Sequence, residues 1–407
     1  MDIRIQKSKL LNQQEIQITG SKSESNRLLL LQALYPEILI ENLSNSDDSV
    51  LMQNALSSDD TIVDIHHAGT AMRFLTAYFS IQDDREVTLT GSSRMKERPI
   101  KILVDALRAL GSEITYLENE GFPPIKIVGK KLSKRKVSLK ANVSSQYISA
   151  LLLIASRLEN GLELCLEGKI TSVPYIKMTL SLLNEVGIET SFVENTISVK
   201  PQISNLKPKI LTVESDWSSA SYFYSVIALS EIGTQITIGS YKKQSLQGDS
   251  VLAELYQSFG VQTYYTYKSV RLVKANMVSA KDLNFHLSDA PDIAQTIAVT
   301  AFGLGIACDM TGLHTLKIKE TDRLVALKTE LEKLGAEVTI SDASLHLKSS
   351  HKIKSGVSIA TYKDHRMAMA FAPLGLKTSI LIENAEVVSK SYPQFWEDFK
   401  AIGFDLK

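Results

Sequence analysis

Cysteine is scarce in this chain, whose 407 residues include only Cys165 and Cys308. Both lie in apolar stretches of the sequence, so a disulfide framework and a CxxC metal site are excluded. A surplus of one charge is also missing, since 45 Lys and Arg residues balance 45 Asp and Glu residues. This balance excludes the strong basic field that nucleic-acid or anionic-membrane partners require.

Long apolar runs are missing as well. The nearest candidate runs from Ile297 to Cys308 and is too short to span a membrane. The segment from Met1 to Lys7 has no apolar signal region. With 44% hydrophobic and 22% charged residues, the composition is that of an ordinary soluble protein. We therefore expect a soluble cytoplasmic protein without a membrane partner.

What the chain does have is an internal repeat, and its length favours two domains. An amphipathic helix that ends in an apolar residue and a glycine recurs along the sequence. The closing glycines are Gly111, Gly187, Gly260, Gly335 and Gly403. Glycine suits this place because the left-handed end of a helix is strained for other residues.

A second repeated element is a helix rich in apolar and small residues, opened by polar residues or glycine. Its copies open at Lys22, Gly69, Ser144, Trp217, Asp292 and Asp364. A helix that is apolar on most faces must be buried. Short strands, such as residues 86–90 and 236–238, lie between the helices.

The two repeats together predict six α/β units, three in each domain. The first unit is short, because only 47 residues separate Lys22 from Gly69, whereas 75 separate Gly69 from Ser144. The segment from Leu56 to Ile65 lacks the glycine that closes the helix and a pair of strands. The polar stretch from Lys200 to Pro208 is the best linker between the domains.

Basic residues gather at several of the polar helix starts. Arg27, Arg73 and Arg366 lie in such starts, and residues 94–98 and 317–323 form further basic clusters. The start of a helix offers free N–H groups and a partial positive charge, and Arg binds phosphate and carboxylate in a bidentate way. The pattern predicts anion sites. Helix capping and solvated surface ion pairs are the alternatives.

At these residues the chain resembles the EPSP synthase (3-phosphoshikimate 1-carboxyvinyltransferase) family of enolpyruvyl transferases, nearly end to end. The shared motifs are residues 20–27 (GSKSESNR), 68–73 (AGTAMR), 94–100 (RMKERPI), 144–146 (SSQ), 174–176 (PYI), 291–292 (PD), 319–324 (KETDRL), 364–368 (DHRMA) and 390–393 (KSYP). Any one motif is weak, but nine in the family's order are specific.

The resemblance implies a fold of two globular halves, each built from three βαβαββ units. Their buried helices would point to an interdomain cleft. Residues 1–14 and 214–407 would form one domain, and residues 20–211 the other. The implied reaction moves the enolpyruvyl group of phosphoenolpyruvate to the 5-hydroxyl of shikimate 3-phosphate, releasing phosphate, in the shikimate pathway to chorismate and aromatic amino acids. The implied partners are these two substrates alone, the protein is expected to be a monomer, and neither a cofactor nor a metal is expected.

The resemblance also assigns the site residues. Shikimate 3-phosphate would be held by Lys22, Ser23, Arg27, Ser144, Ser145, Gln146, Ser172, Asp292, Thr315 and Lys319. Phosphoenolpyruvate would be surrounded by Lys22, Gly69, Arg94, Gln146, Arg323, Arg366 and Lys390. Both substrates are polyanions, and serine hydroxyls at a helix start suit a phosphate monoester.

In catalysis, Asp292 would be the base at the 5-hydroxyl, and Glu320 with Lys22 would handle the proton for the methylene carbon. Glu320 lies between Lys319 and Arg323, which favour its ionised form and argue against a simple acid role. The proton donor therefore stays open. His365 is either a proton carrier or a residue that orients Arg366.

Three features depart from the family pattern. His67 replaces the usual Asn before Ala-Gly-Thr, Thr315 replaces the Asn four residues before Lys319, and the first unit is short. None of these changes touches a charged residue of the motifs.

Two other functions are considered. The sister enzyme transfers the same group to UDP-N-acetylglucosamine, but that family carries a cysteine in the loop that corresponds to Gly91 to Pro99, where this chain has none. A non-catalytic phosphometabolite-binding protein would need the phosphate ligands but neither Asp292 nor Glu320.

Overall fold

The computed structural model describes residues 1–140, 144–168, 170, 172–202, 206–278 and 281–407. These residues form two compact units: unit 1 comprises Met1–Thr19 and Glu214–Lys407, and unit 2 comprises Gly20–Val213. The chain enters unit 2 at Gly20, where a Cβ atom would lie 1.8 Å from the carbonyl oxygen of Asn42. Only glycine fits so close to a neighbouring backbone.

The units divide between Val213 and Glu214 and not at the polar stretch 200–208, so the linker inferred from composition is wrong; residues 203–205 of that stretch lie outside the described chain. Strand β12 (Lys209–Thr212) follows that stretch and pairs in parallel with β3 (Ile38–Glu41) of unit 2. A polar segment with proline marks a loop, but its composition does not show that the next strand returns to the same unit.

The described residues of unit 2 form three sheets. In each four-stranded sheet, two parallel strands are joined through a buried helix, and an antiparallel hairpin completes the sheet. The first consists of β4 (Ile62–Asp64), β5 (Glu86–Thr90), β7 (Ile125–Val128) and β6 (Glu113–Tyr116), and the second of β8 (Lys136–Lys140), β9 (Leu162–Glu167), β11 (Thr196–Val199) and β10 (Thr190–Val193). The third sheet is the pair β12–β3 alone. This missing hairpin confirms that the first unit of the repeat is short.

Unit 1 repeats the same plan with strands from both ends of the chain. Its sheets are β2 (Gln14–Ile16), β13 (Gln235–Gly239), β15 (Ser269–Lys274) and β14 (Val261–Tyr265); β16 (Asp282–His286), β17 (Ala307–Thr311), β19 (Ser344–Leu347) and β18 (Val338–Ile340); and β20 (Val357–Ile359), β21 (Ile380–Ile382) and β1 (Ile3–Ile5). Arg4 and Lys407 exchange backbone hydrogen bonds of 2.8 and 2.9 Å, so the two termini lie side by side.

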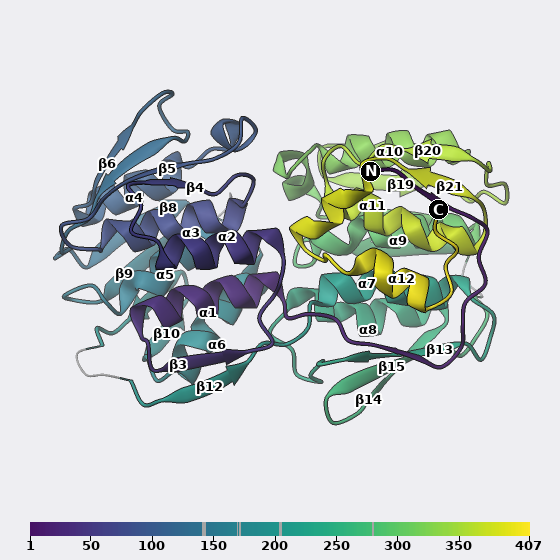
Figure 1. Ribbon diagram of the computed structural model, residues 1–407, viewed down its shortest axis with the longest axis horizontal. Helices are drawn as coiled ribbons and strands as arrows, with labels where there is room; N and C mark the ends of the chain where they lie inside the picture. The colour runs from purple at the N-terminus through teal and green to yellow at the C-terminus, as the bar shows by residue number, and fades with distance from the viewer. Residues whose placement is uncertain (141–143, 169, 171, 203–205, 279–280) are drawn as a thin grey trace. The chain divides into compact units, whose positions relative to one another are not determined.

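The apolar repeat forms the buried helices that the sequence predicts. They are α1 (Lys22–Leu34), α3 (Gly69–Ser80) and α5 (Ser145–Ala155) in unit 2, and α7 (Trp217–Leu229), α9 (Ala294–Leu304) and α11 (His365–Phe371) in unit 1. Figure 1 shows them in the middle of their units, with the strands around them. Because these helices are apolar on most faces, they must be enclosed, and polar residues within them can pair with one another, as Thr300 does with Ser225.

The amphipathic repeat forms a second set of helices. They are α4 (Lys101–Leu110), α6 (Val173–Glu185), the one-turn α8 (Leu252–Leu255), α10 (Arg323–Leu334) and α12 (Phe395–Ala401). Helix α2 (Asp47–Ser57), in the short first unit, is a further helix that the repeat did not predict. All five predicted closing glycines have positive φ angles, from 77° at Gly260 to 113° at Gly111, which confirms their role at left-handed helix ends. No helix among the described residues is long and apolar enough to cross a membrane.

One buried helix is shorter than its apolar pattern indicates. Helix α11 ends at Phe371, and residues Ala372–Leu376 continue as a 3-10 turn, η6. Pro373 explains the change, because proline has no backbone N–H and its ring clashes with the preceding helical turn.

The closing glycines provide a stability test. We expect Gly111→Ala to lower the free energy of unfolding by roughly 1–2 kcal/mol, because φ is 113° there. The nearest atom outside the flanking residues would lie 4.0 Å from the new Cβ, so strain and not a clash would cause the loss.

Gly111→Asn is the matched variant, since Asn tolerates left-handed backbone better than Ala. It should lose less stability than Gly111→Ala in urea unfolding. Equal losses, or none, would contradict a conformational origin.

Candidate active site

The starts of the three buried helices of unit 1 meet at Arg366. Asp292 lies in η4 (Pro291–Ile293), which leads into α9, and Ser218 lies in the first turn of α7. Nη2 of Arg366 donates to Oδ2 of Asp292 at 3.0 Å and to Oγ of Ser218 at 3.2 Å. Asp364 caps α11, and its Oδ1 accepts the backbone N–H of Arg366 at 2.9 Å. One guanidinium therefore ties three helix starts together.

A second arginine, Arg323, holds three carboxylates at the start of α10. Its guanidinium donates to Asp292 at 2.8 Å, to Glu320 at 2.7 Å and to Asp364 at 2.7 Å. The side chain is only 2% exposed. Burial lowers the pKa of Arg323, but Asp364, Glu320 and Asp292 raise it more, and the net pKa lies above the ordinary value. Arg323 is therefore a permanent cation that fixes three acids.

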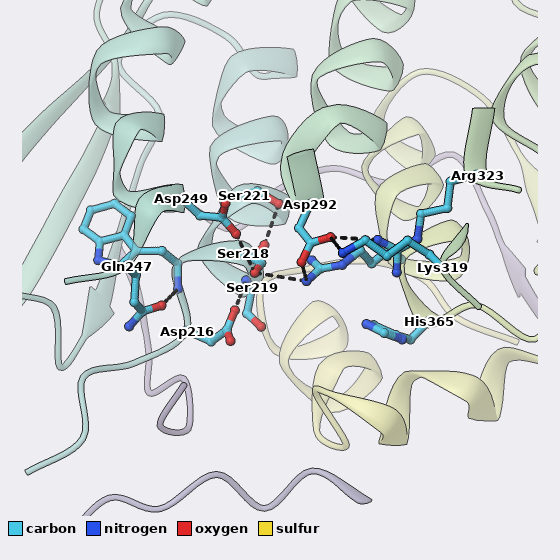
Figure 2. Close-up of polar contacts among 12 residues, drawn as sticks. Asp216, Ser218, Ser219, Ser221, Gln247, Asp249, Asp292, Lys319, Arg323 and His365 are labelled. Atoms are coloured by element: carbon cyan, nitrogen blue, oxygen red, sulfur yellow. Dashed lines mark hydrogen bonds and ion pairs between the residues drawn. The ribbon is translucent and has the colours of Figure 1, made fainter. Parts of the chain in front are cut away.

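Asp292 is the residue on which these contacts converge. Arg323 and Arg366 each bind one of its oxygens, and Nζ of Lys319 lies 3.4 Å from Oδ1. Its side chain is 15% exposed, so the carboxylate is held by these cations and still reaches solvent. Figure 2 shows Asp292, Lys319 and Arg323 turned toward one another. Cations around a carboxylate favour its ionised form, which can accept a proton from a hydroxyl.

A strained turn places Asp364 and Arg366. Tyr362 and Lys363 are both left-handed, with φ angles of 53° and 55°. The buried Glu330 of α10 accepts the hydroxyl of Tyr362 at 2.6 Å and the N–H of Ala360 at 3.1 Å. Consecutive left-handed residues are costly without such support, and strain of this kind clusters at functional sites.

Lys390, the last residue of η7 (Ala385–Lys390), is fixed to the same turn. Its Nζ donates to the carbonyl oxygen of Lys363 at 2.7 Å. His365 follows Asp364 and is almost fully buried, at 1% exposure. This environment does not decide between a proton carrier and a residue that orients Arg366, so both interpretations stay predictions.

Asp249 adds a further carboxylate, from η2 (Gly248–Val251). It is 4% exposed, and Oδ2 accepts the hydroxyl of Ser218 at 2.8 Å. Figure 2 shows Ser218 between Asp249 and Asp292. Burial, and then the charge of Asp292, raise the pKa of Asp249 to about 7.

In unit 2, the starts of α3 and α5 lie together. Nε2 of Gln146 donates to Oγ1 of Thr70 at 3.4 Å, next to Gly69. Ser144 is the N-cap of α5 and accepts the backbone N–H of Gln146 at 3.3 Å, while Ser145 is buried. The structure thus brings together Gly69 and Gln146, and it confirms helix capping by Ser144.

Arg27 of α1 is buried in a network of its own. It donates to Thr179 at 2.8 Å, to Ser149 at 2.9 Å and to the carbonyl of Ser23 at 2.6 Å. Burial lowers its pKa to about 10, so it stays charged at neutral pH. These contacts lock the guanidinium where α1, α5 and α6 pack.

The basic loop before α4 places a different arginine at Gly69 from the one expected. A Cβ on Gly69 would lie 2.3 Å from Nη1 of Arg98, so the guanidinium of Arg98 covers this glycine. Arg94 instead pairs with Glu97 at 2.8 Å, and its side chain is 52% exposed. The buried Arg73 lies near Arg98, whose charge adds to burial in lowering the pKa of Arg73 to about 10.

The remaining predicted residues lie at or near element ends. Lys22 and Ser23 open α1, and Ser172 precedes α6 with a left-handed φ of 54°. Thr315 lies in η5 (His314–Ile318), and within the described chain its buried hydroxyl has no hydrogen-bond partner. His67, the other departure from the family pattern, lies 3.6 Å from Asp47.

Ser218, Asp249, Glu330 and Arg98 were not predicted as site residues. Arg98 could have been found from the sequence, because it lies in the same basic motif as Arg94, four positions further along the chain. The other three carry no local signal, because an isolated Ser, Asp or Glu in a helix is ordinary. In the part of the chain that the structure describes, no group of three or more His, Cys, Asp and Glu residues could hold a metal ion.

The raised pKa of Asp249 predicts a pH dependence of stability. An unfolded aspartate titrates at about 3.9. Between that pH and the folded pKa of about 7, the native protein binds more protons than the unfolded chain. Through this group, stability is highest below the unfolded pKa and falls as the pH rises toward the folded one.

We therefore expect the free energy of unfolding of Asp249→Asn to fall less, or rise more, than that of the wild type as the pH increases from 5 to 7, values that bracket most of this window. Urea unfolding at several pH values measures the slope. Parallel pH profiles for the two proteins would show that Asp249 does not titrate there.

The comparisons with known proteins agree on one family. The family model described as EPSP synthase (3-phosphoshikimate 1-carboxyvinyltransferase) matches residues 53–399. A protein of Bacteroides fragilis (strain YCH46) named 3-phosphoshikimate 1-carboxyvinyltransferase is 46% identical over 397 residues, or 96% of both chains. A protein of Haemophilus influenzae (strain PittEE) with the same name is 36% identical over 423 aligned positions, which cover 95% of this chain and 96% of the relative.

Solved structures show the same fold. An EPSP synthase from Acinetobacter baumannii superposes with a TM-score of 0.81 at 20% identity, covering 100% of this chain and 99% of the other. The fold prediction of a two-part enolpyruvyl transferase is thereby confirmed. Since the family model spans most of the chain and close relatives span nearly all of it, this chain belongs to the EPSP synthase (3-phosphoshikimate 1-carboxyvinyltransferase) family.

Proposed function

We propose that this protein transfers the enolpyruvyl group of phosphoenolpyruvate to the 5-hydroxyl of shikimate 3-phosphate. The names of its relatives support the reaction. The observation that carries the proposal is the anchoring of Asp292 by Arg323, Arg366 and Lys319. A carboxylate held by three cations is poised for proton chemistry on a polyanionic substrate. We further propose that the enzyme acts in the cytoplasm as a monomer.

The reaction adds the hydroxyl oxygen to C2 of phosphoenolpyruvate and a proton to C3. The resulting tetrahedral ketal phosphate then loses phosphate together with a proton from C3, which restores the carbon–carbon double bond. We propose that Asp292 accepts the hydroxyl proton. Arg323 and Arg366 keep the carboxylate ionised and supply positive charge where phosphate charge shifts. Glu320 and Lys22 are the two candidates for the proton that reaches C3. The ion pair of Glu320 with Arg323 favours its ionised form, so Glu320 would need a change in its surroundings to act as an acid.

For shikimate 3-phosphate, we propose the residues that the family resemblance assigns. They are Lys22, Ser23, Arg27, Ser144, Ser145, Gln146 and Ser172 in unit 2, and Asp292, Thr315 and Lys319 in unit 1. Arg27 already uses most of its donors within unit 2, so its main contribution is positive charge at the start of α1. The buried hydroxyl of Thr315, without a partner in the described chain, supports a ligand contact there.

For phosphoenolpyruvate, we propose Lys22, Gly69, Gln146, Arg323, Arg366 and Lys390, together with Arg98 in place of Arg94. Arg98 lies against Gly69, whereas Arg94 is half exposed and paired with Glu97. A guanidinium over a glycine can approach a small anion together with backbone N–H groups of the α3 start.

The two alternatives are not favoured. The curated relatives of this chain carry the name of the shikimate 3-phosphate enzyme, not of the UDP-N-acetylglucosamine enzyme. A non-catalytic binding protein does not explain why Asp292, Glu320 and Asp364 are held around a buried arginine, since such a protein needs only the cations.

Phosphate release tests the function directly. We expect the purified protein to release phosphate from phosphoenolpyruvate with shikimate 3-phosphate but not with UDP-N-acetylglucosamine. Asp292→Asn should bind both substrates and lose about 10²–10⁴-fold in kcat, because it removes the base while keeping its size. Wild-type turnover by this variant would exclude Asp292 as the base, and release with only the nucleotide sugar would overturn the proposed acceptor.

The choice between the two arginines of the loop is a separate prediction. Arg98→Ala should raise the KM for phosphoenolpyruvate at least about tenfold, because a hydrogen bond to a charged group is worth roughly 1.5–3 kcal/mol. Arg94→Ala is the matched control and should change KM less than about twofold, since it breaks only an exposed ion pair. A larger effect from Arg94→Ala would restore Arg94 to the site.

A further inference from the structure

We propose that Asp249 is a positioning residue that orients Arg366 through the hydroxyl of Ser218. The proposal rests on the proposed function, in which Arg366 binds phosphoenolpyruvate. It concerns unit 1 alone, because all three residues belong to that unit. The hydrogen-bonded path from Asp249 to Arg366 runs through Ser218, and the charge of Asp249 also acts on Arg366 through space. Asp249 touches neither substrate in this account.

The direction of the hydrogen bonds makes Ser218 a relay. Its hydroxyl donates to Oδ2 of Asp249 at 2.8 Å and accepts from Nη2 of Arg366 at 3.2 Å. A serine hydroxyl has one proton and two lone pairs. When the proton is committed to Asp249, the lone pairs face the guanidinium. Without Asp249 the hydroxyl could rotate and would no longer be fixed as an acceptor for Arg366.

The same Nη2 atom also donates to Oδ2 of Asp292 at 3.0 Å. Ser218 and Asp292 therefore set the plane of the guanidinium from two helix starts. Arginine recognises carboxylate and phosphate through a planar fork, so a rotated guanidinium loses its bidentate geometry even though its charge remains.

Asp249 is poorly explained as a stabilising residue. It is 4% exposed, and its Oδ1 has no hydrogen-bond partner within the described chain. Burial and the charge of Asp292 both raise its pKa, which means that its ionised form costs stability. A buried acid whose side-chain hydrogen bond, among the described residues, runs to Ser218 and from there to Arg366 is explained by positioning.

The test is a double-mutant cycle with steady-state kinetics. Asp249→Ala and Ser218→Ala should each lower kcat/KM for phosphoenolpyruvate by about tenfold, and the double variant should lose no more than either single variant. Asp249→Asn should retain kcat/KM within about threefold, because its amide oxygen can still accept the hydroxyl of Ser218.

Asp398→Ala is the matched control. Asp398 also has a pKa raised mainly by burial and also accepts a hydroxyl, that of Tyr392, but none of its contacts in the described chain involves Arg366 or Asp292. It should change stability without changing KM. Thermal unfolding of every variant, with kinetics measured well below the transition, separates loss of folded enzyme from loss of orientation.

Three results would overturn the proposal: wild-type KM in Asp249→Ala, losses that multiply in the double variant, or equal losses in Asp249→Asn and Asp249→Ala. Each of these is measured against an active wild type, so the proposed function survives it. An inactive wild type would instead overturn the proposed function, and the positioning role with it.

Discussion

The buried guanidinium of Arg323 is the constraint on which the unit 1 site depends. A cation at 2% exposure must be paired, because desolvating an isolated charge is far too costly. Its three partners come from η4, from the segment just before α10 and from the cap of α11. Arg323 therefore neutralises these acids and fixes three separate elements relative to one another. These contacts fix the position of the Asp292 carboxylate.

The six buried helices share one physical constraint at their first turns. An apolar helix can be enclosed along its body, but its first N–H groups need polar partners. In unit 2 these starts carry Lys22, Arg27 and Arg98 beside the buried Glu24 of α1, and the cations suit the binding of polyanions. In unit 1 they carry both acids and bases, which suits proton transfer.

Backbone strain is concentrated next to Asp364. The left-handed Tyr362 and Lys363 precede Asp364, and Glu330 and Lys390 hold them from two other elements. Packing alone does not explain why the buried carboxylate of Glu330 accepts a hydrogen bond from the exposed Tyr362. The hydrogen bond is explained if the turn must hold Asp364 and Arg366 close to Arg323, because a strained backbone persists only where its surroundings stabilise it.

Much of this protein could be predicted from the sequence alone. The period of the repeat predicted the buried helices and the short first unit, and the closing glycines predicted left-handed helix ends, because both signals are local. The motifs singled out Asp292, Lys319, Arg323 and Arg366, which the structure brings together. Pro373 is an exception. Proline is a local signal for the end of a helix, but the apolar pattern continues past it, so the pattern alone did not predict that α11 ends at Phe371.

Only the tertiary structure decided the contacts between elements. Arg94 and Arg98 share one motif, and the path of the chain through η1 (Met95–Glu97) determines which of them covers Gly69. Asp249 and Ser218 are 31 positions apart, and no periodicity relates them. The stretch 200–208 resembles a domain linker until β12 is seen to pair with β3. Sequence patterns report which residues share a helix face or a turn. Which side chains from different elements meet depends on packing, and a local pattern does not contain that information.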